Sequence, residues 1–195
     1  MQRESWGYIT GMKSVFVLIV FTYLVGLPQP GQADQTDPKL NLLFSRLQAS
    51  HSYSEAAPIE QTIWQIWSVR GDPQVDRAMA YGIAAMNVGG YGKAISLFSQ
   101  IINRTPDYAE AWNKRATVNY LMARYDESVR DIEKTLMLEP RHFGALSGLG
   151  LIYVATGNLK AAAKVWRKAL NINPFMPGIK DKLADIERDL RGQKI

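Results

Sequence analysis

The chain has 195 residues, of which 47% are hydrophobic and 21% charged, a globular composition that argues against wholesale disorder. Its net charge of +5 is mild and its basic residues are interspersed, whereas a nucleic-acid-binding domain usually gathers them on one face, so no nucleic-acid partner is expected. Cysteine is absent, which excludes disulfides, thiolate zinc sites and cysteine nucleophiles.

Residues 1–33 are predicted to be a secretory signal peptide. Residues 15–27 (VFVLIVFTYLVGL) form an uncharged apolar run after Lys13. Gly31 and Ala33 then place small residues at the −3 and −1 positions of a cleavage site. We therefore expect cleavage after Ala33 and export of the protein to the periplasm or cell envelope.

Two features of this segment stay open. Translation starts at Met1 or at Met12, and Met12-Lys13 makes the more typical basic start. The apolar run has 13 residues, whereas a membrane helix needs about 20, so a mature chain starting at Asp34 is preferred over a retained membrane anchor.

Residues 34–74 are predicted to form a linker and a divergent helical hairpin. Asp37-Pro38 is a suitable start for a first helix, which would carry the apolar residues Leu40, Leu43, Phe44 and Leu47. A second apolar cluster predicts another helix that is closed by Gly71; its members are Ile59, Ile63, Trp64, Ile66 and Trp67. We expect this hairpin to pack on the first of the units that follow.

A 34-residue period runs through residues 75–176. Pro106, Pro140 and Pro174 are spaced one period apart. Other columns recur in the same register: Gly82, Ala116 and Gly150; Tyr91, Tyr125 and Leu159; Ala94, Ser128 and Ala162; Phe98, Ile132 and Trp166. Because one such unit cannot bury its apolar face alone, a fixed period of this length indicates stacked copies, here 75–108, 109–142 and 143–176.

Each unit is predicted to contain two helices joined by a short turn. The small residues of the columns let the paired helices approach closely, while Phe98 and Trp166 fill the space between units. Asp107 and Glu110 have the spacing of a capping box at the start of the second unit. Arg115 lies in a core column, so we expect it to pair with Asp131, with Asn119 and His142 as further members of that network.

Residues 177–195 are predicted to be a capping helix and a tail. Ile179, Leu183, Ile186 and Leu190 are spaced 4, 3 and 4 residues apart, which gives one apolar stripe on an otherwise charged helix. Such a helix would cover the exposed face of the third unit.

The columns resemble the tetratricopeptide repeat, whose pattern is the Trp-x₂-Leu-Gly-x₂-Tyr, Ala-x₃-Phe and Pro series. The resemblance covers residues 75–106, 109–140 and 143–174, and the third unit matches best. It implies an all-α solenoid of antiparallel helix pairs, with the divergent hairpin before it and the capping helix after it. The whole arrangement resembles exported bacterial proteins that have a few such repeats and no assigned catalytic domain.

The resemblance also implies a binding groove on the concave side, lined by the first helix of each unit. The residues expected there are Met79, Ile83, Met86, Asn87, Asn113, Thr117, Tyr120, Leu121, Ser147, Leu151 and Val154. This neutral, partly apolar lining suits a peptide or helix that is held by apolar anchors and Asn side chains. Alternatively, Ile83, Leu121 and Leu151 pack against the capping helices.

Some members of the family grip a peptide's terminal carboxylate with basic residues on successive first helices. The third unit has Gly144, Ser147 and Gly148 where such residues would be needed. Binding of a terminal carboxylate is therefore not expected.

We thus expect a non-enzymatic adaptor or assembly factor whose partner is another protein or peptide, with no catalytic, cofactor-binding or metal-binding residues. The only histidines, His51 and His142, lie in different units, which argues against a metal cluster. Three alternatives stay open: a membrane-tethered scaffold with an uncleaved anchor, an enzyme with a site scattered across the groove, and self-association through apolar end faces.

Overall fold

The computed structural model describes residues 34–192, and this part of the chain contains nine α-helices and no strand. The predicted signal peptide therefore lies outside the described residues. Within them, no helix combines the length and the apolarity needed to cross a membrane. The helices are α1 Lys39–Ala49, α2 Tyr53–Trp67, α3 Pro73–Asn87, α4 Tyr91–Arg104, α5 Ala109–Leu121, α6 Tyr125–Leu138, α7 Phe143–Ala155, α8 Leu159–Ile172 and α9 Ile179–Gly192.

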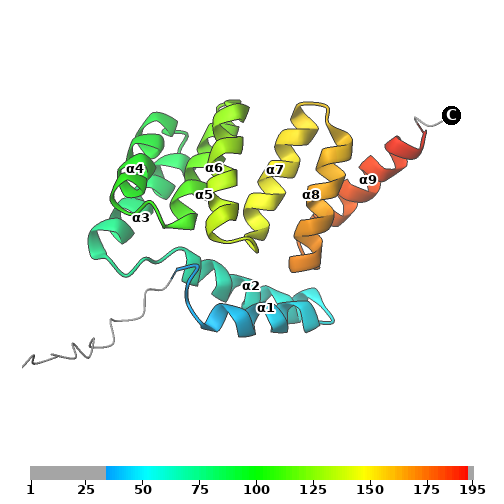
Figure 1. Ribbon diagram of the computed structural model, residues 1–195, viewed down its shortest axis with the longest axis horizontal. Helices are drawn as coiled ribbons and strands as arrows, with labels where there is room; N and C mark the ends of the chain where they lie inside the picture. The colour runs from blue at the N-terminus through cyan, green and yellow to red at the C-terminus, as the bar shows by residue number, and fades with distance from the viewer. Residues whose placement is uncertain (1–33, 193–195) are drawn as a thin grey trace, which may run out of the picture.

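The helices α3 to α8 form three consecutive pairs that stack side by side in chain order (Figure 1). The second and third pairs lie within the units predicted at 109–142 and 143–176, whereas α3 begins at Pro73, two residues before the first unit. The all-α solenoid is confirmed. Buried side chains from successive pairs join into shared apolar clusters, such as Phe98 and Ile101 of α4 with Ala111 and Val118 of α5. Stacking therefore buries the face that one pair alone would leave exposed.

The turn inside each pair needs a left-handed residue at the same column. Gly89, Ala123 and Gly157 occupy it, with φ angles of 76°, 56° and 75°. The turn accepts alanine in the second unit, although a side chain in this conformation costs roughly 1 kcal/mol relative to glycine.

The small residues of the repeat columns mark places where paired helices meet. A Cβ atom at Gly82 would lie 2.5 Å from the Phe98 ring, and one at Gly150 would overlap the Trp166 indole. The Trp166 Nε1–H also donates a hydrogen bond of 3.1 Å to the Ser147 carbonyl oxygen. These contacts confirm that small residues let the paired helices approach closely in the first and third units.

The capping helix is also confirmed. On α9 the buried side chains of Ile179, Leu183 and Ile186 share an apolar cluster with Trp166 of α8. They cover the side of the third unit that no further pair follows.

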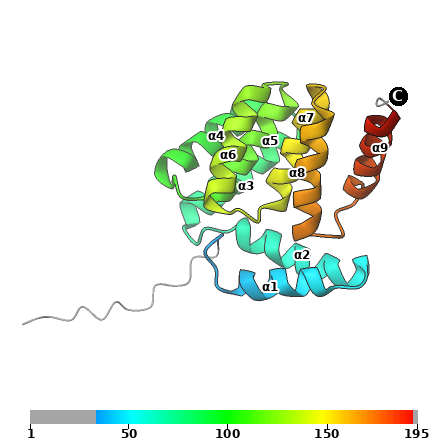
Figure 2. The same ribbon diagram turned by 45° about the vertical axis from the view of Figure 1, so that its right-hand side comes forward.

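The N-terminal hairpin forms as predicted, but its predicted position on the first repeat is wrong. In both views α1 and α2 lie across one end of the stacked pairs (Figures 1 and 2). Trp67 of α2 stacks on His142, with ring centroids 4.1 Å apart, and Trp64 meets Phe143 edge to face at 5.3 Å. The hairpin therefore packs where the second unit meets the third, because the aromatic rings find partners there and Gly144 leaves room for Trp64.

The segment between the hairpin and the first unit is held by charged side chains. Arg70 is 8% exposed and forms ion pairs with Asp34 and Asp107. Asp72 begins α3 by accepting hydrogen bonds from the backbone amides of Gln74 and Val75, and these bonds lower the pKa of its carboxyl. The preceding helix ends at Trp67, earlier than expected, and Gly71 adopts a φ angle of 85° in the linker.

Candidate functional site

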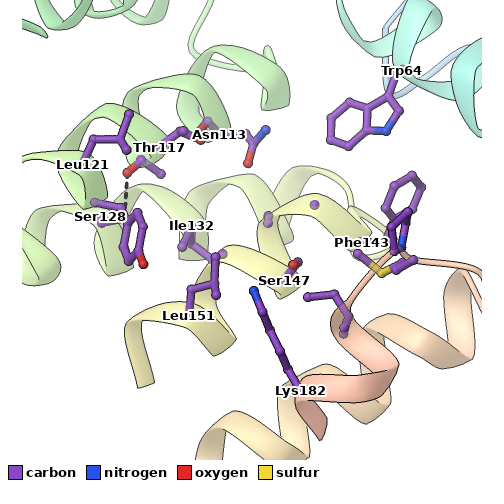
Figure 3. Close-up of a pocket in the computed structure, with 18 of the residues that line it drawn as sticks. Trp64, Asn113, Thr117, Leu121, Ser128, Ile132, Phe143, Ser147, Leu151 and Lys182 are labelled. Atoms are coloured by element: carbon purple, nitrogen blue, oxygen red, sulfur yellow. Dashed lines mark hydrogen bonds between the residues drawn. The ribbon is translucent and has the colours of Figure 1, made fainter. Parts of the chain in front are cut away.

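The first helices of the second and third units border a pocket of about 490 Å³, which we call the central pocket (Figure 3). Its walls come from α5, α6 and α7, and it is closed by residues of α2 on one side and of α9 on another. A smaller space of about 310 Å³, the side pocket, lies between α7 and α9. Leu151 and Lys182 line both pockets.

Seven of the predicted groove residues line these two pockets. Six reach the central pocket: Asn113, Thr117, Tyr120, Leu121, Ser147 and Leu151. The seventh, Val154, lines the side pocket and is 38% exposed. Their spacing along α5 and α7 places them on one face, because residues three and four apart are neighbours on a helix.

The first unit does not contribute to the pockets. Met79 was expected in the groove, but it is 1% exposed and belongs to the apolar core shared with α4 and α5. Ile83 and Met86 are partly buried against the same core, and Asn87 is exposed outside both pockets. The groove prediction is therefore wrong for Met79, because the large side chains of α3 fill the junction between the first two units.

Sequence reasoning missed the residues that close the central pocket from distant parts of the chain. Trp64 and Glu60 come from α2, and Ile179 and Lys182 come from α9. Figure 3 shows Trp64 and Lys182 on different sides of the pocket, with Asn113 and Thr117 across from Lys182. The only available signal was the clustering of aromatic residues in α2, which does not say where that helix docks.

The two charged side chains in the central pocket differ in their hydrogen-bond partners. Glu60 Oε1 accepts a hydrogen bond from Trp64 Nε1 at 3.3 Å, and its Oε2 accepts one from Asn173 Nδ2 at 3.0 Å. Lys182 forms no ion pair with any residue in the range 34–192, and its side chain is exposed. The pocket therefore offers one available cation in a mainly apolar lining.

A buried polar network lies directly behind the pocket. Glu110 is 1% exposed; its Oε1 pairs with Lys114 Nζ at 2.8 Å, and its Oε2 lies 2.9 Å from His142 Nε2. Because His142 Nδ1 accepts a hydrogen bond from the Ala145 amide, the proton of the neutral ring resides on Nε2, which donates to Glu110. Asn113 Nδ2 also donates to Glu110 at 3.0 Å, so this network orients a pocket residue.

The charges around Glu110 determine its protonation. Burial by itself raises the pKa of this carboxyl, but the Lys114 ammonium and the hydrogen bond from His142 outweigh burial and lower the pKa to about 2. The expected capping box with Asp107 is wrong: α5 begins after Tyr108 without a side-chain cap, Asp107 pairs with Arg70, and Glu110 points into the network. A buried carboxylate is stabilised more by two nearby donors and a cation than by one exposed amide.

A tetratricopeptide repeat-containing protein of Rhizobium etli is 33% identical over 156 residues, which make up 80% of this chain and 76% of that protein. The chain belongs to the tetratricopeptide repeat family. The family model described as tetratricopeptide repeat matches residues 122–177, which span the second helix of the second unit and the whole third unit.

Other similar proteins share the repeat domain within longer chains or as isolated domains. The Hsp70-Hsp90 organizing protein of Triticum aestivum is 31% identical over 58% of this chain, but the match spans 19% of that protein. The first tetratricopeptide domain of Spaghetti (RPAP3), solved with the HSP90 peptide SRMEEVD, superimposes with a TM-score of 0.57 at 19% identity, covering 60% of this chain and 93% of that one. This structural similarity confirms the fold.

Gly144, which stands where a terminal-carboxylate clamp would need a basic residue, lies against the N-terminal hairpin in this tetratricopeptide repeat protein. At Gly144 a Cβ atom would overlap the Trp64 ring, so any side chain there would force this ring to move. The hairpin thus occupies space that would otherwise be open at this end of the groove.

The second charged cluster of the repeat region lies outside the groove. Arg115 makes the predicted bidentate contact with Asp131, with Nε and Nη2 at 2.8 and 2.7 Å from its two oxygens. Asn119 joins them at 3.2 Å as expected, whereas His142 does not, because it is held by Glu110. Among the described residues no group of three or more His, Asp or Glu side chains is placed to hold a metal ion.

Proposed function

We propose that this tetratricopeptide repeat protein is a non-enzymatic adaptor that binds a peptide or helix of another protein in the central pocket. The observation that carries the proposal is that six predicted groove residues from α5 and α7 line one pocket of about 490 Å³. Its size and its largely uncharged lining are typical of a binding site with a few orienting polar groups.

The similar proteins support binding of a peptide, and the pocket residues indicate which kind. The RPAP3 domain was solved with an HSP90 peptide that ends in an acidic residue. Here Gly144, Ser147 and Gly148 stand where basic residues would hold such an end. We therefore expect a partner segment that is recognised mainly by apolar anchors and by the side chains of Asn113 and Thr117.

Replacing Thr117 by arginine is expected to weaken peptide binding by about tenfold or more, because the long charged side chain fills the pocket. Thr117 is exposed, and its hydroxyl donates only to the Asn113 carbonyl at 2.9 Å. Peptides selected from a display library on the full chain would be titrated against both proteins by fluorescence polarisation.

Thr62→Arg is the matched control. Thr62 is an exposed threonine on α2 whose hydroxyl donates to the Pro58 carbonyl at 2.8 Å, and it does not line the pocket. Binding should be unchanged in this variant. Equal loss in both variants, or no loss with Thr117→Arg, would place peptide binding on another surface and overturn the proposal.

We further propose that the protein is exported and that its leader is removed after Ala33. The proposal is supported by the basic, apolar and small-residue pattern of residues 1–33. N-terminal sequencing of the chain recovered from the envelope fraction of a bacterial host is expected to begin at Asp34. A sequence that begins at Met1 or Met12 in the membrane fraction would instead support the membrane-tethered scaffold.

A further inference from the structure

Lys182 lies where the central pocket and the side pocket meet. It lines both, together with Leu151, and it reaches the groove from α9, opposite the first helices of the repeats. Figure 3 shows its side chain extending into the central pocket. The groove therefore continues on both sides of one ammonium group.

The other charges near the groove leave this ammonium available. Glu60 uses both carboxylate oxygens for hydrogen bonds to Trp64 and Asn173. Asp185 lines the side pocket, but it forms an ion pair with Arg188 one turn further along α9. Within residues 34–192, no carboxylate lies within ion-pair distance of Lys182.

The apolar surroundings of Lys182 determine which kind of peptide segment binds over it. Leu151, Ile179 and Ile186 give the groove apolar walls on both sides of the ammonium group. A purely apolar segment that fills the groove would strip water from the charge without replacing it, which is costly. A segment with a carboxylate at this point would instead form a charge-assisted hydrogen bond with the ammonium.

We propose that the groove binds an internal segment of a partner protein in which one acidic residue lies between apolar residues. This inference rests on the proposed function, since it names the kind of peptide that the same groove takes. The acidic residue pairs with Lys182, and its neighbours fill the central pocket on one side and the side pocket on the other. The central pocket of about 490 Å³ and the side pocket of about 310 Å³ both border Lys182. The peptide therefore continues past this residue and does not end at it.

The test uses two display libraries of random peptides about twelve residues long, which span about 40 Å when extended. In one library the peptide is fused at its C-terminal end, so that it has no free carboxylate there. In the other library the C-terminus is free. We expect the full chain to select, from both libraries, peptides with Asp or Glu at one fixed position and apolar residues on both sides.

Charge reversal at Lys182 provides the decisive readout. Lys182→Glu is expected to lower the affinity for the acidic peptides by about tenfold. A fresh selection on this variant is expected to yield peptides with Lys or Arg at the fixed position in place of the acidic residue. Lys180→Glu is the matched control, because Lys180 is an exposed lysine of the same helix that lines neither pocket. It changes the net charge equally and should leave both affinity and selected sequence unchanged.

The outcomes separate this inference from the proposed function. Selection only from the library with free C-termini would show that a terminal carboxylate is bound, and it would overturn the inference. Peptides that lose binding with Thr117→Arg but show no acidic preference would also overturn it, while leaving the groove as the binding site. Peptides insensitive to both Thr117→Arg and Lys182→Glu would overturn both proposals.

Discussion

Replacing Gly150 by alanine is expected to lower the free energy of unfolding by about 2–3 kcal/mol. The added methyl group would overlap the Trp166 indole, which is 1% exposed and packed in the apolar cluster shared with α9. To accommodate it, α7 and α8 must separate or the indole must leave its hydrogen bond with the Ser147 carbonyl. Either change opens the apolar cluster that α9 covers.

Gly148→Ala on the same helix is the matched control. A Cβ atom there has only the Ile132 Cδ1 atom nearby, at 3.8 Å, which is an ordinary contact. Alanine has the higher helix propensity by about 1 kcal/mol, so this variant should be as stable as the parent or slightly more stable. Urea denaturation followed by circular dichroism measures both variants. Similar stabilities for the two would mean that the α7–α8 contact adapts freely, contrary to this packing model.

The contact between Gly150 and Trp166 illustrates why the repeat region was predictable from the sequence. Gly150 and Trp166 belong to columns that recur every 34 residues, so the same small-to-large contact is seen in the first unit as Gly82 and Phe98. Each copy is an independent instance of one local packing rule. Because helix pairing within a unit depends on residues close together in the chain, the period was sufficient to predict it.

The hairpin shows where the same reasoning fails. Its apolar residues predict two helices, but no column of the repeat says which surface they cover. That surface is chosen by contacts between residues far apart in the chain, such as the stacking of Trp67 on His142 and the fit of Trp64 over Gly144. From the sequence, His142 was expected to join the Arg115 cluster, and its contact with Trp67 could be found only from the fold.

The candidate site was predictable to the extent that it belongs to the repeats. Thr117 and Leu151 were expected there because the resemblance to the family implies a groove lined by the first helix of each unit. Trp64 and Lys182 instead enter the pocket from the hairpin and the capping helix. Met79 was misplaced because the same helical spacing serves both a groove and a junction between units. Which of the two a residue lines depends on how closely the neighbouring pair stacks.

The second large effect on stability is expected in the buried network around Glu110. Replacing Glu110 by glutamine is expected to destabilise the protein on the order of 3 kcal/mol at pH 7, since the pKa of Glu110 is lowered from 4.5 to about 2. Glutamine has nearly the same shape, but it leaves the Lys114 ammonium without its carboxylate. Because the same residue also accepts from Asn113 and His142, the loss extends to the wall of the pocket and to the start of α7.

The pH dependence distinguishes lost charge from lost packing. A carboxyl whose pKa is lower in the folded state stabilises the protein above its unfolded pKa, and this contribution disappears as the pH falls through its folded pKa. The difference in unfolding free energy between the parent and Glu110→Gln should therefore be constant above about pH 5 and should shrink toward zero between pH 4.5 and about 2. Urea denaturation at a series of pH values measures it.

Glu133→Gln, at an exposed position of α6 with no ion pair among the described residues, should match the parent at every pH. If the stabilities of the parent and Glu110→Gln instead ran parallel down to pH 2, the loss would come from altered packing and the carboxylate would contribute no charge stabilisation. If they converge as expected, the charge of Glu110 is what holds Lys114, Asn113 and His142 in place. The wall of the central pocket would then depend on a buried carboxylate that does not itself line the pocket.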